Sequence, residues 1–279
     1  MSEQTLIEVN NLNKIFTDFW GRKKAHALKD VSLKIAQSQV FALLGPNGSG
    51  KTTFIKILLG LLAPSKGSAS IFGESIFKTS NKSRIGLLPE ASYFYGNLSG
   101  YETLNFYGKL LGLPKTIRKE RIEYLLDLTE MSSQASRFVG DYSQGMQRRI
   151  GIAQALLADP ELLILDEPTN GLDPLAIDQV HNLISNLKNE GKTVLICTHL
   201  LSETETICDN LAILHEGSIL SEGNLIDLYK QNDCTNMKEL FHKVLSIASP
   251  KKMTTEEQPD ENQNDNQPDQ DYLDKLTQS

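Results

Sequence analysis

The chain has 279 residues, of which 39% are hydrophobic and 23% charged, and its formal net charge is −7. This composition is ordinary for a globular protein and allows one large α/β domain with a tail. Residues 254–279 carry eight acidic side chains and one basic one, so the remainder of the chain is formally neutral. Nucleic-acid binding is therefore disfavoured, because neutralising backbone phosphates needs a basic face.

The chain shows no sign of a disulfide framework, a zinc site or a membrane span. Cys197, Cys208 and Cys234 lack CxxC spacing and are odd in number, which favours a reducing compartment. No apolar run approaches the roughly 20 residues that span a bilayer, and the first residues lack the features of a signal peptide. We expect a cytoplasmic protein that only another chain would hold at a membrane.

Apolar runs alternate with amphipathic stretches over residues 5–233, which predicts a single domain of α/β architecture. The expected strands are 7–9, 31–35, 40–44, 69–71, 85–88, 162–165, 193–197, 210–215 and 218–222. The expected helices are 51–61, 100–111, 117–128, 144–157, 175–189 and 200–208. Residues 234–253 form a short helical extension, with an amphipathic pattern over 234–249. Residues 254–279 are too polar to offset their ordering entropy, so we expect an acidic, disordered tail.

A phosphate-binding loop follows the apolar run that ends at Leu44. Residues 45–52, GPNGSGKT, fit GxxxxGK[ST] in full, between an expected strand and an expected helix. The glycines let backbone N–H groups approach an anion at the start of the helix, while Lys51 reaches the outer phosphates and the Thr52 hydroxyl ligates Mg²⁺. The predicted nucleotide-binding residues of this loop are Gly45, Pro46, Asn47, Gly48, Ser49, Gly50, Lys51, Thr52 and Thr53.

Two carboxylates end the apolar strand expected over 162–165. In an open α/β sheet the carboxyl ends of the strands face the ligand. Asp166 and Glu167 point in different directions, because side chains alternate along a strand. Asp166 suits the shell of Mg²⁺, and Glu167 suits a general base that polarises water.

The stretch YSQGMQRR at residues 142–149 resembles the signature of ATP-binding-cassette (ABC) transporter ATPases, a Ser-Gly motif that opens a helix just before the acidic strand. Residues 170–174, NGLDP, match the family's dimer-contact loop. Thr198-His199 matches its switch histidine, and residues 14–16, KIF, match the segment whose aromatic ring stacks on adenine. The resemblance covers residues 5–233.

The resemblance implies a P-loop NTPase of the ABC ATPase type, with a mixed-sheet core, an antiparallel β subdomain and a helical subdomain that carries the signature. It implies that Phe16 stacks on adenine and that His199 acts with Glu167 at the γ-phosphate. Ser143 and Gly145 would contact the ATP of a partner subunit, so hydrolysis needs a head-to-tail dimer of two copies or of this chain with a paralogous ATPase.

Three departures from the family pattern stand out. Gln144 replaces the first glycine of the signature, and Met146 replaces its glutamine. Glu90 stands where a glutamine usually meets the metal and the attacking water; its carboxylate can still ligate Mg²⁺ but adds negative charge. Residues 17–24 are an insertion whose Phe19 or Trp20 is an alternative to Phe16 against adenine.

The expected function is hydrolysis of ATP, with Mg²⁺, that drives transport through a separate transmembrane permease, with export favoured and no nucleic acid involved. The chain would lie at the cytoplasmic face of the membrane. Tyr93, Phe94 and Tyr95 follow Glu90 and are either the surface that meets the permease or part of the core. The alternatives are an importer subunit, a soluble ABC protein of ribosomes or DNA, and a switch that does not hydrolyse ATP.

Overall fold

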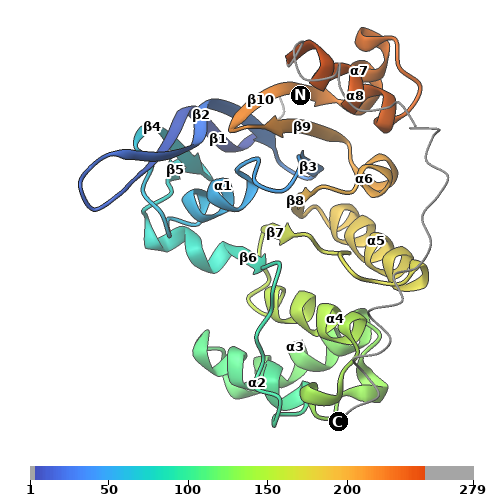
Figure 1. The fold of residues 1–279 in the computed structure, drawn as a ribbon. Helices are drawn as coiled ribbons and strands as arrows, with labels where there is room; N and C mark the ends of the chain where they lie inside the picture. The colour runs from blue at the N-terminus through green and yellow to red at the C-terminus, as the bar shows by residue number, and fades with distance from the viewer. Residues whose placement is uncertain (1–3, 249–279) are drawn as a thin grey trace, which may run out of the picture. The chain divides into compact units, whose positions relative to one another are not determined.

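The computed structural model describes residues 4–248, which form one compact unit built on two sheets (Figure 1). The predicted acidic tail and the last residues of the predicted extension lie outside the described residues. The first sheet is antiparallel, in the order β2-β1-β4-β5. Its strands are β1 (Thr5–Thr17), β2 (Lys23–Ala36), β4 (Lys66–Ile71) and β5 (Glu74–Ser75).

The second sheet has the order β10-β9-β3-β8-β7-β6 and is parallel except for β10. Its strands are β3 (Val40–Leu44), β6 (Ile85–Leu88), β7 (Leu162–Asp166), β8 (Thr193–Thr198), β9 (Asn210–His215) and β10 (Ser218–Asn224). Parallel strands are covered on both faces and read as continuous apolar runs. All five residues of β3 and of β7 are buried, as this rule requires.

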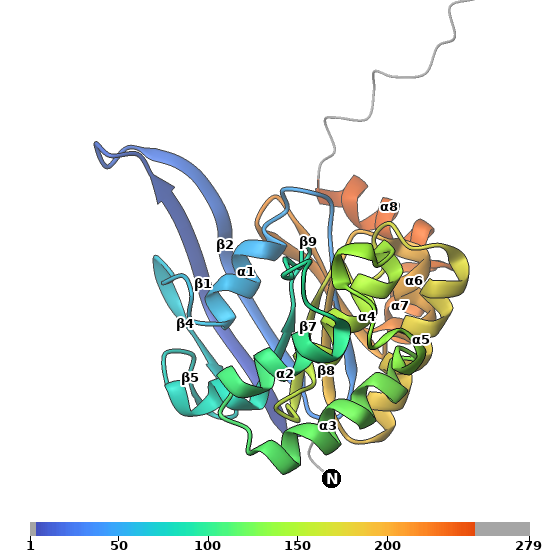
Figure 2. The same ribbon diagram turned by 90° about the horizontal axis from the view of Figure 1, so that it is seen from below.

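Helix α1 (Lys51–Leu58) packs against both sheets, with Phe54 and Ile57 fully buried (Figure 2). Phe41 and Leu43 of β3 join this cluster, because alternate side chains of a strand face the same side. The opposite face of the second sheet is covered by α5 (Pro174–Asn189), by the helix before β9 and by the two helices after β10.

A group of helices beyond β6 and β7 contains α2 (Gly100–Leu110), α3 (Lys115–Leu128) and α4 (Gln144–Ala155) (Figure 1). Three short 3₁₀ turns, η1 (Thr79–Arg84), η2 (Ser132–Gln134) and η3 (Val139–Asp141), lie in the connections. The remaining helices are α6 (Leu201–Ile207), α7 (Leu225–Asn232) and α8 (Met237–Ala248). The predicted architecture, a mixed core sheet with an antiparallel sheet and a helical part that carries residues 142–149, is confirmed.

The first hairpin is much longer than the strands predicted over 7–9 and 31–35. Beyond Asn13 strand β1 pairs only with β2, and residues 17–25 are exposed on both faces of the ribbon. An exposed ribbon has no apolar alternation, so the pattern that marks a half-buried strand is absent there. Helix α7 was missed for a related reason: only two of its eight residues are buried.

The amphipathic helix expected near residues 234–249 is confirmed as α8. Its Met237, Leu240 and Val244 are buried in a cluster with β9 and α7. Cys197 is buried, Cys208 and Cys234 are half-buried, and all three are free, as expected. Within residues 4–248 no helix combines the length and the apolar character that crossing a membrane needs.

Candidate functional site

The loop between β3 and α1 folds as the spacing of its glycines predicts. Gly48 and Gly50 have φ angles of +79° and +116°, a region that favours glycine. A Cβ on Gly45 would lie 2.2 Å from the carbonyl oxygen of Leu214 in β9, so only glycine fits against that strand. The loop therefore wraps tightly around the start of α1, where backbone N–H groups have no partners inside the helix.

The Lys51 ammonium is held inside this loop and beside a carboxylate. Its Nζ donates to the carbonyl oxygens of Gly45 at 2.6 Å and Pro46 at 3.3 Å. It also lies 3.4 Å from Oε1 of Glu167, and the two side chains are only 6% and 5% exposed. These partners allow the ammonium to be buried, and because Lys51 also lines the pocket beside the loop, it can meet an anion that enters there.

One pocket collects most of the residues predicted to bind nucleotide and metal. It is lined by Pro46, Asn47, Gly48, Gly50, Lys51, Thr52 and Thr53 of the loop, by Glu90, Asp166 and Glu167, and by Ala27 of β2. Gly45 and Ser49 lie behind this lining and shape the loop. Residues from four separate parts of the sequence thus meet at the carboxyl ends of parallel strands, where ligands of α/β sheets bind.

The two carboxylates at the end of β7 both line this pocket, although strand alternation predicts that they point in different directions; Glu167 lies just past the end of the strand. Asp166 is buried; its burial, together with the nearby charges of Glu167 and Glu90, raises the pKa of Asp166 to about 6, against the opposing effect of Lys51 and Arg148. An added cation would favour the ionised form of this carboxylate.

Glu167 is the centre of a hydrogen-bonded group that includes His199. Its Oε2 accepts from the Thr198 hydroxyl at 3.1 Å, and Nδ1 of His199 lies 2.9 Å from the same oxygen. In the tautomer that carries its proton on Nδ1, His199 donates to this oxygen. The Glu167 backbone has a φ of +49°, a conformation that costs free energy in a residue with a side chain and that occurs often at functional sites.

Ser143 and Gly145 lie at the start of α4 and do not line this pocket. The Ser143 hydroxyl accepts from the backbone N–H of Met146 at 3.3 Å and caps the helix. The nearest atom to a Cβ built on Gly145 would be 3.7 Å away, an ordinary contact. The fold of this chain therefore does not itself require glycine at position 145.

Phe16 is exposed and pairs with Ala25 across the hairpin. Ala27 of β2 lines the pocket, and a register shift between Lys14 and Ile15 separates it from the Phe16–Ala25 pair. Phe16 itself is not among the residues that line the pocket. Phe19 and Trp20 lie further out, in the turn that joins β1 and β2.

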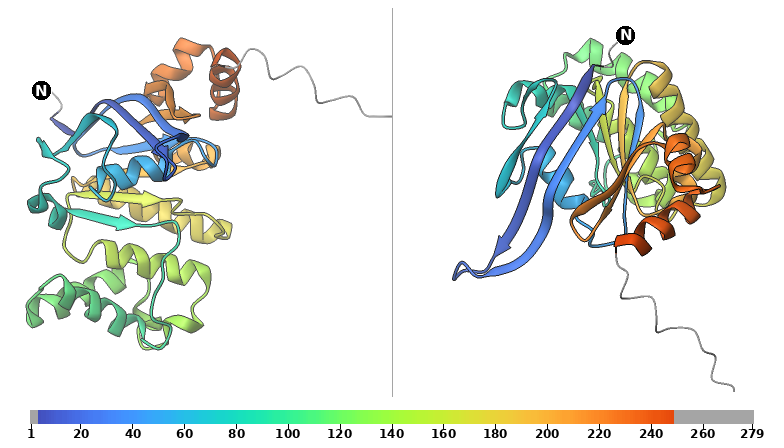
Figure 3. Two further views of the ribbon diagram at one scale, coloured as in Figure 1. Left: turned by 60° about the vertical axis from the view of Figure 1, so that its left-hand side comes forward. Right: turned by 90° about the horizontal axis from the view of Figure 1, so that it is seen from above.

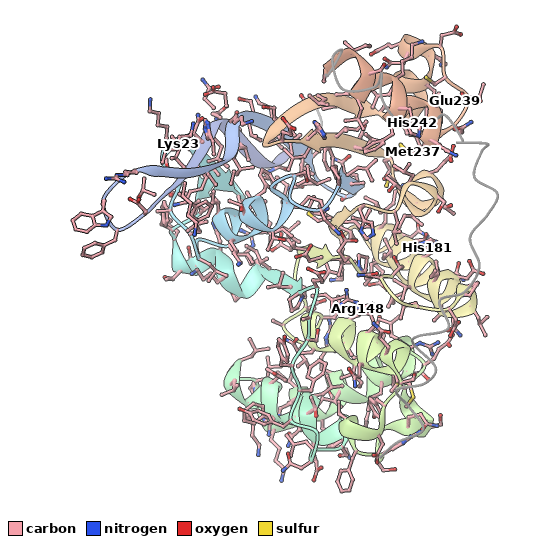
Figure 4. All side chains as sticks on the ribbon, viewed as in Figure 1. Lys23, Arg148, His181, Met237, Glu239 and His242 are labelled. Carbon is pink, nitrogen blue, oxygen red and sulfur yellow. The ribbon has the colours of Figure 1, made fainter. Side chains whose placement is uncertain are left out.

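Arg148 is a functional candidate to which the sequence analysis assigned no role. It is buried, and its guanidinium donates to five carbonyl oxygens (Figure 4). They belong to Pro89 (2.8 Å), Glu90 (2.8 Å), Asp166 (2.9 Å), Glu167 and Pro168 (3.1 Å). The sequence clue to this role is an arginine among the apolar positions of α4. Burial lowers the pKa of the Arg148 guanidinium. The Arg148 side chain thereby links α4 by hydrogen bonds to the segments that follow β6 and β7.

Residues 28–170, which include the loop, both carboxylates and the start of α4, match the family model described as ABC transporter. The chain belongs to the ABC transporter family. It is an ATP-binding subunit of that family, and the reaction of such a subunit is ATP hydrolysis.

Curated relatives are ATP-binding proteins of ABC transporters, and some of their names include the substance transported. A Synechocystis ABC transporter ATP-binding protein is 41% identical over 81% of this chain, which spans 65% of that relative's length. The bacitracin transport ATP-binding protein BcrA of Bacillus licheniformis is 40% identical over 82% of this chain and 72% of its own. The Nod factor export ATP-binding protein I of Cupriavidus pinatubonensis is 38% identical over 77% of this chain and 66% of its own.

A solved structure described as the ATP-binding subunit of an ABC transporter superposes with a TM-score of 0.76 at 31% identity. The match covers 86% of this chain and 99% of that one. The two sheets and the helical part of this ABC ATPase are thus those of its family.

Proposed function

We propose that this ABC ATPase hydrolyses ATP with Mg²⁺ as a head-to-tail dimer and drives an exporter whose membrane-spanning permease is a separate chain. The main support for the proposed dimer is the glycine at position 145. Nothing in the chain needs it, yet it stands at the exposed start of a helix that Ser143 caps, where an anion from outside fits.

The roles of the residues follow from their contacts. The phosphate-binding loop and Lys51 hold the phosphates of ATP, and Phe16 stacks on adenine. Mg²⁺, when bound, neutralises phosphate charge; the Thr52 hydroxyl and the carboxylates of Asp166 and Glu90 are hard oxygen donors that line one pocket and fit it. Among the described residues no cluster of three or more His, Cys, Asp or Glu side chains is placed to hold a metal ion by itself.

Glu167 takes a proton from water as general base, and His199 orients its carboxylate through the 2.9 Å contact and acts beside it at the γ-phosphate. Ser143 and Gly145 of one subunit close on the ATP of the other. Each ATP is then enclosed only when two subunits meet, which couples a local phosphate event to a movement of whole subunits.

The partner and the direction of transport are inferred from relatives and from an exposed aromatic surface. The relatives' names speak of bacitracin transport and Nod factor export. Tyr93 and Tyr95, three and five positions after Glu90, are exposed, while Phe94 packs against α2, edge to face with Tyr107. We assign this surface to the permease, which would hold the ATPase at the cytoplasmic face of the membrane.

Mixing two inactive variants tests the dimer. Lys51→Ala removes the phosphate-binding cation, and Gly145→Asp adds a side chain and a negative charge where the partner's phosphate would lie. Each variant alone should lose ATPase activity, whereas a mixture should regain it, because the loop of the Gly145→Asp subunit meets the intact signature of the Lys51→Ala subunit. Steady-state phosphate release measures this.

The unfolding midpoint of Gly145→Asp should equal that of the wild type, since the position has room and an acid suits the start of a helix. A mixture that hydrolyses ATP no faster than its parents would contradict the reciprocal sites.

Glu90→Gln should strengthen ATP binding and raise the Mg²⁺ concentration that hydrolysis requires. Glu90 lines the pocket with Asp166 and Glu167, so removing its charge reduces repulsion of the phosphates. One charge at this range changes the interaction by about 1 kcal/mol or more, which is about fivefold. The KM for ATP should fall and the half-saturating Mg²⁺ concentration should rise, both by about fivefold. Glu123→Gln, on the exposed face of α3, is the matched control, and equal effects of the two substitutions would refute this role.

A further inference from the structure

The β1–β2 hairpin projects beyond the sheet to which it belongs (Figures 1 and 3). Pairing of β1 with β4 ends at Asn13 and Lys66, whereas pairing of β1 with β2 continues to Thr17 and Lys23. The outer part is therefore a ribbon of two strands with both faces exposed. An isolated two-stranded ribbon is only marginally stable. Packing within this chain therefore does not explain which residues the ribbon carries.

The turn at the end of this ribbon presents two aromatic rings to solvent. Phe19 is 95% exposed and Trp20 is 78% exposed, and their rings meet edge to face with centroids 5.7 Å apart. The turn that carries them is ordered by one carboxylate: Oδ1 of Asp18 accepts from the backbone N–H groups of Trp20 at 2.9 Å and Arg22 at 2.8 Å. Single exposed apolar side chains are common, but a pair of aromatic rings at the end of a projection indicates a binding surface.

Three basic residues follow the aromatic pair in the sequence. Arg22, Lys23 and Lys24 are exposed, and Lys23 lies on the projecting hairpin (Figure 4). The one acid of the turn, Asp18, has its carboxylate engaged with backbone N–H groups. From Asp18 to Lys24 the charge is three basic minus one acidic, or +2, although the chain up to residue 253 is formally neutral.

We propose that this tip, residues 18–24, docks on an anionic lipid surface. Tryptophan and phenylalanine lie at the headgroup level of membranes, where one side of the ring is apolar and the other wet, and adjacent lysines and arginines are drawn to anionic lipid. The aromatic rings of the tip suit the boundary between headgroups and acyl chains, and its basic residues suit the anionic headgroups. The inference concerns a contact between this chain and lipid, and so it goes beyond the contact with the permease proposed above.

The tip adds a second attachment at the membrane and does not replace the permease. Each basic residue near an anionic surface strengthens binding by about fivefold at low salt, and the effect is screened by salt. Two aromatic rings and three cations therefore give weak, reversible binding that orients the subunit. In a dimer two tips would act together.

Trp20 is the only tryptophan of the chain, so its fluorescence reports on the tip alone. The full-length protein, without permease, should be titrated with vesicles of phosphatidylglycerol and phosphatidylcholine, and with vesicles of phosphatidylcholine alone. We expect a blue shift of the emission with the anionic vesicles, little or none with the neutral ones, and reversal by salt. Brominated acyl chains in the anionic vesicles should quench the emission.

Variants that keep Trp20 separate charge from aromatic contact. Lys23→Gln combined with Lys24→Gln should weaken binding to anionic vesicles by about 25-fold, five for each charge. Phe19→Ser should reduce both binding and the blue shift. Lys115→Gln combined with Lys119→Gln, at exposed positions at the start of α3, is the matched control and should bind as the wild type does.

The proposal is overturned if anionic vesicles leave the emission of Trp20 unchanged, or if the lysine pair at 23 and 24 and the pair at 115 and 119 behave alike. A shift with poly-glutamate as large as that with vesicles would assign the tip to an acidic protein surface instead and would also overturn it. The ATPase assay of mixed variants is run without lipid, so failure of the dimer and failure of lipid binding are distinguished.

Discussion

Glu167→Gln should reduce steady-state ATP hydrolysis by about 100- to 10,000-fold, the contribution typical of a general base, while ATP still binds. The carboxylate accepts from Thr198 and His199 and faces Lys51, so it is both oriented and held near the phosphate-binding loop. An amide of the same shape cannot accept the proton of water. With Mg-ATP the variant should accumulate as a stable dimer, because closure continues and hydrolysis no longer reopens it. Phosphate release and size-exclusion chromatography measure the two effects.

Glu161→Gln is the matched control for this experiment. Glu161 stands just before β7, at the end opposite to Glu167, exposed and paired with Arg84 at 2.6 Å. Surface ion pairs of this kind contribute about 0–1 kcal/mol, so this variant should hydrolyse ATP as the wild type does. If Glu167→Gln hydrolyses as fast as this control, Glu167 is not the base. If Glu167→Gln binds Mg-ATP and still forms no dimer, the head-to-tail arrangement is wrong.

Arg148→Met should lower the free energy of unfolding by about 3 kcal/mol or more. Removing one partner of a buried hydrogen-bond group leaves the other polar atoms unsatisfied, at about 1–3 kcal/mol each when no water reaches them. The five carbonyl oxygens that Arg148 contacts end β6 and β7 and include those of Asp166 and Glu167. Loss of these hydrogen bonds should also displace the carboxylates of Asp166 and Glu167, so kcat should fall. ATP binding by the phosphate-binding loop, which Arg148 does not contact, should be retained. Urea unfolding and ATPase assays measure these effects.

Arg149→Met is the neighbouring control on the same helix. Arg149 pairs with the exposed carboxylate of Glu130 at 3.3 Å and also donates to the Gln179 side chain, so its loss should cost less than the loss of the five contacts of Arg148. Arg148→Lys keeps the charge but lacks the planar fork that spans several carbonyl groups, so it should be intermediate and folded. Equal unfolding midpoints for Arg148→Met and Arg149→Met would refute the structural role of Arg148.

The Arg148 contacts show why the sequence analysis left this residue without a role. Its partners lie 18 to 59 residues away along the chain. All are backbone carbonyl groups, which every residue has, so the sequence does not identify them. The full extent of the β1–β2 hairpin was missed for a related reason: an exposed ribbon has no buried face, so nothing in its composition follows the strand period.

The phosphate-binding loop, the acidic end of β7 and the capped start of α4 could all be predicted from residue types alone. Each is a local feature whose chemistry demands particular residue types a few positions apart, such as the glycines of positive φ at 48 and 50. The resemblance had already implied the places of Glu90, His199 and Ser143, but the direct contact of His199 with Glu167 and the five carbonyl contacts of Arg148 are visible only in the folded chain. Those arrangements depend on which strand ends come together in space, and residue spacing along one segment does not specify that.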